Sequence, residues 1–350
     1  MPPLLKFGVG DCMPDFRLMD TDRHVRSLLT LALGKPIVVL FYGGNKSSLT
    51  RDTLRGFAEV NGALAERAVV FAINGEAVEE NIRFSEEMEL PFPLLADPEQ
   101  LAITLYDLGR ARPGENGPAI AGALACLVAD PNCRIMRIDP CVTDPDYAQK
   151  ILAFVEGIPE DIPQEVGTHA PVLVVPRVFD PDFCQRLIEQ YETAGNQPSG
   201  VRQGDGYSSV NVLDAEQKSR RDHVVVEPVL KQEIKNLIIK RVVPELSKAF
   251  GYQVKRGEKF KIACYDAKDR GFFQPHRDNC HLEGGRRFAM SLNLNTGEYQ
   301  GGYLKFPEYG GHLYRPSAGD AVLFSCLLAH EATPVTAGRR FALLTFFRED

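Results

Sequence analysis

Apolar residues in the first half of the chain fall into short continuous runs separated by an amphipathic stretch. The continuous runs cover residues 35–42 and 69–74, a length typical of buried strands. Between them, residues 50–67 place apolar side chains at helical spacing. This strand–helix–strand order predicts two parallel strands joined by a right-handed crossover. With further strands expected in residues 90–97 and 123–138, this half is predicted to be an α/β domain.

The second half of the chain has amphipathic helices first and strands last. A strand is expected at residues 171–176, followed by a helix that begins at Asp180. A second amphipathic helix covers residues 228–250, where Pro244 should break or kink it. The apolar stripes of these helices are expected to pack on the outer sheet of a β barrel or jelly roll formed by the later strands.

Length and composition agree with two globular domains. A chain of 350 residues, 44% hydrophobic and 25% charged, is too long for one ordinary core. Residues 157–170 are rich in proline and acidic side chains, so we expect a semi-rigid linker between domains at residues 1–156 and 171–350. Residues 1–160 contain 15 Lys and Arg against 23 Asp and Glu, whereas residues 161–350 contain 25 against 24. The acidic first half argues against nucleic acid as its partner.

A candidate metal site is formed by the H-x-D pair His276 and Asp278 together with His330 further along the chain. Side chains at i and i+2 of a strand point to the same face, so His276 and Asp278 can reach inward together. His330 must then come from a strand beside the first, since residues 320–325 and 341–347 are β-rich runs. Two histidines and one carboxylate leave coordination positions open for substrates, which is typical of non-haem Fe(II) oxygenases.

Arg340 lies at the start of the last apolar run. A guanidinium beside a buried strand must be paired, because an unpaired buried charge costs several kcal/mol. If no protein carboxylate pairs with it, a bidentate carboxylate ligand can do so. We therefore expect Arg340 to hold the distal carboxylate of 2-oxoglutarate, with the neighbouring Arg339 as the alternative. An ordinary ion pair at the strand edge is the structural alternative.

From about residue 171 to the C-terminus, the chain resembles the prolyl-4-hydroxylase-type branch of the Fe(II)/2-oxoglutarate dioxygenases. Besides the H-x-D pair, the matching segments are residues 263–266 (Ala-Cys-Tyr-Asp), 292–295 (Leu-Asn-Leu-Asn), 301–307 and 330–347. The resemblance implies a double-stranded β-helix (jelly roll) with flanking helices. It implies Fe(II) as cofactor and 2-oxoglutarate and O2 as co-substrates, with ascorbate supporting activity. It also implies that Tyr265 helps to bind 2-oxoglutarate and that Asn293 lies near it, where many relatives carry an aromatic residue.

Residues 1–156 resemble a peroxiredoxin, which implies a thioredoxin-like fold. Peroxiredoxins place a low-pKa cysteine at the start of the helix that follows a Phe-Tyr strand end. Here that position falls on Thr50, and no cysteine lies between Cys12 and Cys126. A threonine hydroxyl cannot perform the reaction of a thiolate with peroxide near neutral pH. We therefore expect a domain without peroxidase activity that serves in scaffolding, homodimerisation or substrate presentation.

The eight cysteines contain no C-x-x-C pair. We expect no signal peptide, and no stretch approaches the ~20 apolar residues of a membrane span. Reduced thiols in the cytoplasm are therefore expected. A redox role for Cys126, Cys133 and Cys141, away from the usual peroxidatic position, is a minor alternative.

The basic run at residues 218–221, Lys-Ser-Arg-Arg, has two interpretations. Such runs usually form a solvated face. Alternatively, this run and the Gly-rich residues 200–208 form a mobile lid over the metal that excludes water.

These features together predict a hydroxylase. Fe(II) would bind His276, Asp278 and His330, and 2-oxoglutarate would chelate the metal with its far carboxylate on Arg340 and Tyr265. Reaction with O2 would decarboxylate 2-oxoglutarate to succinate and CO2, with one oxygen atom entering succinate and the other hydroxylating a substrate C–H bond. The substrate would be a prolyl or other peptidyl residue, a free amino acid or a small metabolite. Two alternatives are a redox-sensing or scaffold protein acting through the thioredoxin-like half, and a binding protein with a vestigial site.

Overall fold

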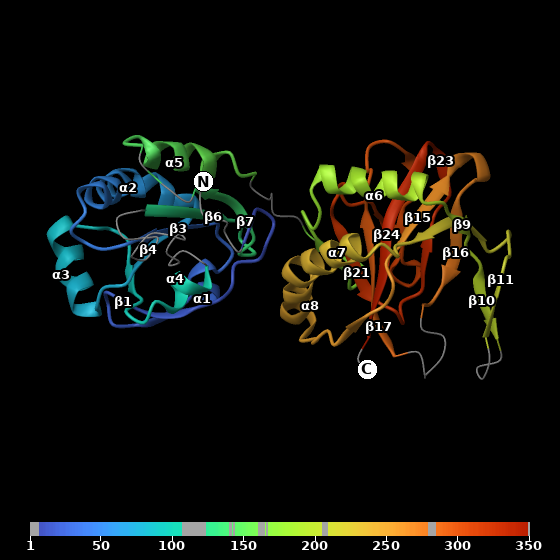
Figure 1. The fold of residues 1–350 in the computed structure, drawn as a ribbon, viewed down its shortest axis with the longest axis horizontal. Helices are drawn as coiled ribbons and strands as arrows, with labels where there is room; N and C mark the ends of the chain where they lie inside the picture. The colour runs from blue at the N-terminus through green and yellow to red at the C-terminus, as the bar shows by residue number, and fades with distance from the viewer. Residues whose placement is uncertain are drawn as a thin grey trace. The chain divides into compact units, whose positions relative to one another are not determined.

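The computed structural model describes residues 7–106, 124–139, 142, 144–159, 165, 167–204, 209–278 and 285–348. The chain divides into two compact units, Met1–Pro163 and Gln164–Asp350 (Figure 1). The division lies within the predicted linker at residues 157–170. No helix in the described part of the chain combines the length and the apolarity needed to cross a bilayer.

The N-terminal unit is built around a seven-stranded sheet with the order β2-β1-β5-β4-β3-β6-β7. Its elements are β1 (Arg17–Asp20), β2 (Val25–Ser27), α1 (Leu28–Ala32), β3 (Ile37–Tyr42), α2 (Ser48–Arg67), β4 (Val69–Asn74), α3 (Val78–Met88), β5 (Leu94–Ala96), α4 (Leu101–Leu105), β6 (Leu124–Ala129), β7 (Ile135–Asp139) and α5 (Tyr147–Glu156). The predicted crossover is present, because α2 connects β3 to β4 and these strands pair in parallel. Every residue of β3 is buried, since apolar clusters cover both faces of the sheet and α2 and α5 contribute to one of them.

The described part of the C-terminal unit contains two large antiparallel sheets and two small two-stranded ones, β10-β11 and β18-β23. One large sheet has eight strands, β8-β21-β17-β24-β15-β13-β9 with β14 beside β24, and the other has five, β12-β16-β22-β19-β20. The elements are β8 (Leu173–Val175), α6 (Pro181–Thr193), β9 (Gln197–Pro198), β10 (Val201–Gly204), β11 (Ser209–Val212), β12 (Lys218–Ser219), β13 (Arg221–Val224), α7 (Pro228–Arg241), α8 (Val243–Phe250), β14 (Arg256–Gly257), β15 (Lys261–Asp266), η1 (Ala267–Asp269), β16 (Phe272–His276), β17 (Arg286–Asn293), β18 (Gln300–Gly301), β19 (Leu304–Lys305), η2 (Pro307–Tyr309), β20 (Leu313–Tyr314), β21 (Ala321–Ser325), β22 (His330–Ala332), β23 (Val335–Ala337) and β24 (Arg339–Arg348).

Helices α6, α7 and α8 pack on one face of the eight-stranded sheet, as expected (Figure 1). They contribute Leu187, Ile234 and Leu246 to a core that side chains of β15, β17 and β24 complete. The helix predicted at residues 228–250 is two helices, because Pro244 cannot continue α7 and instead lies in the first turn of α8.

The opposite face of the eight-stranded sheet meets the five-stranded sheet in two apolar clusters. One contains Ala289 and Phe324 together with Leu304, and the other contains Tyr265 together with Ala332. Each cluster therefore joins strands of both sheets, as in a jelly roll. The predicted site residues lie in and beside this interior.

Candidate metal and co-substrate site

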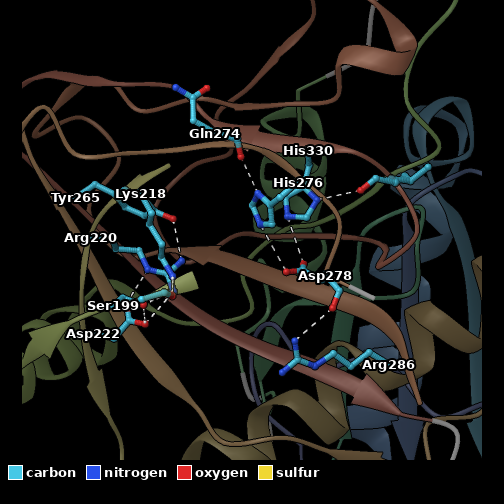
Figure 2. Close-up of polar contacts among 12 residues, drawn as sticks. Ser199, Lys218, Arg220, Asp222, Tyr265, Gln274, His276, Asp278, Arg286 and His330 are labelled. Atoms are coloured by element: carbon cyan, nitrogen blue, oxygen red, sulfur yellow. Dashed lines mark hydrogen bonds and ion pairs between the residues drawn. The ribbon is translucent and has the colours of Figure 1, made fainter. Parts of the chain in front are cut away.

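The structure brings the three predicted metal ligands together (Figure 2). His276 ends β16 and His330 begins β22, and these strands pair antiparallel with the two histidines opposite each other. The Nε2 atoms of His276 and His330 lie 3.6 and 3.3 Å from the two carboxylate oxygens of Asp278. One ligand atom from each residue lies within 4.8 Å of the other two. Three donors that converge in this way can share one ion.

Asp278 reaches the site in a different way from the one predicted. The strand ends at His276, so Asp278 follows it and does not occupy an i+2 strand position. A register shift between Phe273 and His276 disturbs the ladder, and the backbone N–H of Asp278 donates instead to the carbonyl of Cys326, at 3.2 Å. The backbone of Asp278 is therefore positioned by a contact with Cys326, the residue that follows β21.

Backbone carbonyls set the orientation of both imidazoles. Nδ1 of His276 donates to the carbonyl of Gln274 at 2.8 Å, and Nδ1 of His330 donates to that of Leu328 at 3.0 Å. Since a carbonyl only accepts, each Nδ1 carries a hydrogen, which leaves Nε2 as the atom of each ring that can bind a metal. This arrangement of metal-binding histidines fits a divalent transition metal.

The electrostatics of the site favour the ligand forms of these residues. Burial raises the pKa of Asp278, but the close contacts with the imidazoles of His276 and His330 outweigh burial and hold this pKa well below its usual range. Burial lowers the pKa of His276, and the neighbouring His330 adds to this effect. The carboxylate is thus ionised and His276 neutral near pH 7, as metal binding requires.

An ion pair links the two segments that carry the ligands. The guanidinium of Arg277 contacts both carboxylate oxygens of Glu308, at 2.5 and 3.2 Å, and also donates to the carbonyl of Leu327. Glu308 in turn accepts from the backbone N–H of Ala329 at 2.8 Å. Arg277 lies between the ligands of the H-x-D pair and Ala329 precedes His330, so this contact holds the spacing of the two segments.

Replacing Glu308 with glutamine is expected to weaken Mn(II) binding roughly tenfold. Loss of a group that orients metal ligands weakens metal binding by about 10–100-fold, and we expect the lower value because the Arg277–Glu308 pair is partly exposed. Calorimetric titration of the apoprotein measures the change. Glu233→Gln is the matched control, since Glu233 pairs with Arg186 at 2.8 Å and is as exposed as Glu308. Equal affinities of the two variants would contradict the role of Glu308.

Arg340 is a buried cation without a carboxylate partner among the described residues. The residue is 3% exposed, and Nη2 donates to Ser291 Oγ at 3.3 Å and to Asn293 Oδ1 at 3.0 Å. Its Nε has no hydrogen-bond partner in the described part of the chain. Gly302 makes room for the side chain, because a Cβ there would lie 3.0 Å from Arg340 Cδ. A guanidinium in this state can accept a carboxylate ligand.

The other two predicted co-substrate residues adjoin Arg340. Tyr265 lies opposite Arg340 on β15, and the guanidinium carbon of Arg340 is 5.2 Å from the centre of its ring. Asn293 is buried, and its amide nitrogen donates to Tyr299 Oη and the Pro316 carbonyl, at 3.2 Å each. This fixes the Asn293 oxygen toward Arg340, so Asn293 orients the arginine.

The neighbouring Arg339 points to the opposite face of β24. It pairs with Glu192 of α6 at 2.6 Å, and its side chain is 45% exposed. The alternation along β24 thus distinguishes the two arginines and favours Arg340 as the carboxylate-binding residue.

The basic run at residues 218–221 is part of the sheets, so neither of its two predicted roles, a solvated face or a mobile lid, agrees with the structure. Its residues pair with β16 through β12 and with β15 through β13. Lys218 is buried and the side chain of Arg220 is 8% exposed, whereas Arg221 contacts Asn196 near the surface. The period of two places the charged residues 218, 220 and 222 on one face of a strand, and this was the signal that could have identified them as one set.

Residues 200–208, the other part of the predicted lid, lie partly outside the described residues, from 205 to 208. On either side of that gap, β10 and β11 pair as an antiparallel ribbon. The carbonyl of Gly200, at its base, accepts a hydrogen bond from Lys218 Nζ at 3.0 Å. Lys218 thereby connects the ribbon to the sheet that carries His276.

Replacing Lys218 with methionine is expected to raise the free energy of unfolding near neutral pH. Burial, helped by the charge of Arg220, lowers the pKa of Lys218 from 10.5 to about 7. Between these values the unfolded chain binds a proton that the folded chain lacks, so wild-type stability falls as the pH falls from about 10.5 to 7. Urea unfolding should show that Lys218→Met has a higher free energy of unfolding than wild type at pH 7, and that the difference is smaller at pH 10. Equal gains at both pH values would contradict this explanation.

The N-terminal unit places its candidate residues in the interior. Thr50 is buried in the first turn of α2. Cys126 and Cys133 are buried, and burial raises the pKa of Cys126 to about 12, while Cys141 lies outside the described residues. A thiol as buried as Cys126 is a poor nucleophile, which argues against a redox role for it.

Comparison with known proteins gives separate matches for the two units. Residues 9–137 match the AhpC/TSA family, and residues 260–348 match the 2OG-Fe(II) oxygenase superfamily. A PKHD-type hydroxylase of Psychrobacter sp. is 40% identical over 77 residues, which are 21% of this chain and 29% of that protein. A procollagen lysyl hydroxylase and glycosyltransferase of Acanthamoeba polyphaga mimivirus is 24% identical over 172 residues, 48% of this chain and 18% of that protein. The chain thus spans less than a third of either curated relative.

Solved structures also resemble each unit. Peroxidoxin BcpB of Mycobacterium tuberculosis has a TM-score of 0.40 and 23% identity, covering 43% of this chain and 98% of that one. A Pseudomonas putida prolyl-4-hydroxylase has a TM-score of 0.39 and 17% identity, covering 52% of this chain and 94% of that one.

Proposed function

Because this chain joins a peroxiredoxin-like domain to a 2OG-Fe(II) oxygenase domain, as the sequence predicted, we propose that it is a 2-oxoglutarate-dependent hydroxylase with His276, Asp278 and His330 as its iron ligands. Arg340 carries the proposal. It is a buried guanidinium without a carboxylate partner among the described residues, in the unit that brings the triad together. A protein that binds no anion there would leave a costly unpaired charge in its interior.

The residues around the site fit the reaction. Arg340 and Tyr265 would hold the distal carboxylate of 2-oxoglutarate and so orient its keto acid end toward the triad. Phe273 stacks on the His276 ring with centroids 3.5 Å apart, and Phe324 packs on His330 at 4.6 Å, so both rings limit access of water. Fe(II) held by the triad would supply O2 activation, placing one oxygen atom in succinate, with release of CO2, and the other on a substrate C–H bond.

We propose a prolyl or other peptidyl residue as the substrate. The name of the mimivirus relative, a procollagen lysyl hydroxylase, supports a peptidyl acceptor. Free amino acids and small metabolites are the competing class. We further propose that the N-terminal domain lacks peroxidase activity, since Thr50 stands at the peroxidatic position, and that it serves in substrate presentation or homodimerisation. A cytoplasmic location fits the free cysteines among the described residues.

Succinate release from purified protein with Fe(II), ascorbate, O2 and 2-oxoglutarate tests the reaction class. We expect slow metal-dependent turnover without a prime substrate and stimulation by proline- or lysine-containing peptides over free amino acids. Absence of metal-dependent turnover, together with absence of 2-oxoglutarate binding by calorimetry, would overturn the proposal. Stimulation by free amino acids alone would overturn the peptidyl acceptor.

A further inference from the structure

Arg220 is a buried cation that donates a hydrogen bond to the hydroxyl of Tyr265 (Figure 2). Its Nε and Nη2 donate to the two carboxylate oxygens of Asp222, at 2.7 and 2.8 Å. Ser199 Oγ donates to the same carboxylate at 2.7 Å. The remaining terminal nitrogen, Nη1, donates to Tyr265 Oη at 3.1 Å. Asp222 therefore covers one edge of the guanidinium and directs the other toward the tyrosine.

This contact has a consequence for the hydroxyl of Tyr265. A phenol oxygen that accepts from Arg220 must direct its own hydrogen elsewhere. Among the described residues, the Tyr265 hydroxyl has no acceptor for that hydrogen, while the guanidinium of Arg340 lies beside the same ring. Within the described part of the chain, the hydroxyl hydrogen and Arg340 are thus two neighbouring donors that have no carboxylate as acceptor.

The charge balance separates the roles of the two arginines. Arg220 is neutralised by Asp222 through the edge that would otherwise bind a carboxylate in bidentate fashion. Arg340 has no such partner in the described part of the chain. A ligand carboxylate is therefore expected on Arg340, with Arg220 acting through Tyr265.

We infer that Arg220 is a positioning residue for 2-oxoglutarate, which holds the Tyr265 hydroxyl so that its hydrogen points at the distal carboxylate bound by Arg340. The inference rests on the proposed function. It assigns the basic run at residues 218–221 a place in co-substrate binding and makes Asp222 and Ser199 the supports of Arg220.

A double-mutant cycle tests this role. Calorimetry with Mn(II) in place of Fe(II) measures 2-oxoglutarate binding to wild type, Arg220→Lys, Tyr265→Phe and the double variant. Lysine keeps the positive charge opposite Asp222, but its single ammonium group cannot donate to both Asp222 and Tyr265 as the three nitrogens of the guanidinium do. Each single variant is expected to bind roughly tenfold more weakly, the loss of one hydrogen bond to a charged group. The double variant should bind no more weakly than Tyr265→Phe alone.

The outcomes separate the two proposals. Failure of the wild-type protein to bind 2-oxoglutarate would overturn the proposed function. Wild-type binding with additive losses in the double variant would overturn only the inference, since Arg220 would then act independently of Tyr265. Wild-type affinity in Arg220→Lys would overturn it as well. Mn(II) affinity is expected to be unchanged in all variants, which shows that any loss is not a collapse of the site.

Discussion

His276→Ala is expected to abolish metal- and 2-oxoglutarate-dependent succinate formation. The substitution removes one of the three donors that lie within 4.8 Å of one another. Groups that merely orient metal ligands change metal affinity by about 10–100-fold, so loss of a ligand should weaken Mn(II) binding by more than about 100-fold. Residual turnover would then follow only from the small metal-loaded fraction.

Succinate release and Mn(II) titration measure the two effects in parallel. His312→Ala is the matched control, because His312 is an exposed histidine of the same unit whose Nε2 contacts the Thr168 carbonyl at 2.8 Å. It should retain wild-type turnover and metal affinity. Undiminished turnover of His276→Ala would exclude the triad as the metal site.

Arg340→Met is expected to raise the KM for 2-oxoglutarate by on the order of 100-fold or more, since it removes a pair of charge-assisted hydrogen bonds to the distal carboxylate. The free energy of unfolding of the ligand-free protein should not fall, because the substitution also removes a buried cation that lacks a carboxylate partner among the described residues. Loss of affinity without loss of stability is the signature of a ligand-binding arginine.

Steady-state kinetics with varied 2-oxoglutarate and urea unfolding of the apoprotein check both parts of this prediction. Arg339→Met is the control, because Arg339 adjoins Arg340 in the chain but is paired with Glu192 on the other face of the strand. It should leave the KM for 2-oxoglutarate near the wild-type value. A larger effect at Arg339 than at Arg340 would reverse the assignment.

Local patterns in the sequence determined much of the fold because they depend on few long-range contacts. The apolar runs around residues 50–67 predicted the parallel pairing of β3 and β4, and a right-handed crossover is nearly obligatory for such a unit. Pro244 predicted the break between α7 and α8, since proline lacks the backbone N–H and its ring clashes with the preceding turn of a helix. The H-x-D pair and His330 predicted a metal site because few other functions require those side chains in that order.

The tertiary structure decided which face of each strand lies inside. Alternation along residues 218–222 separates two sets of side chains, but only pairing with β15 and β16 turns Lys218 and Arg220 inward. In the same way, Arg339 and Arg340 are neighbours in the chain, but Arg339 lies on the face of β24 where it pairs with Glu192 of α6. The link from Arg220 to Tyr265 joins residues far apart in the chain. Such contacts follow from the register of neighbouring strands, which a period of two cannot specify by itself.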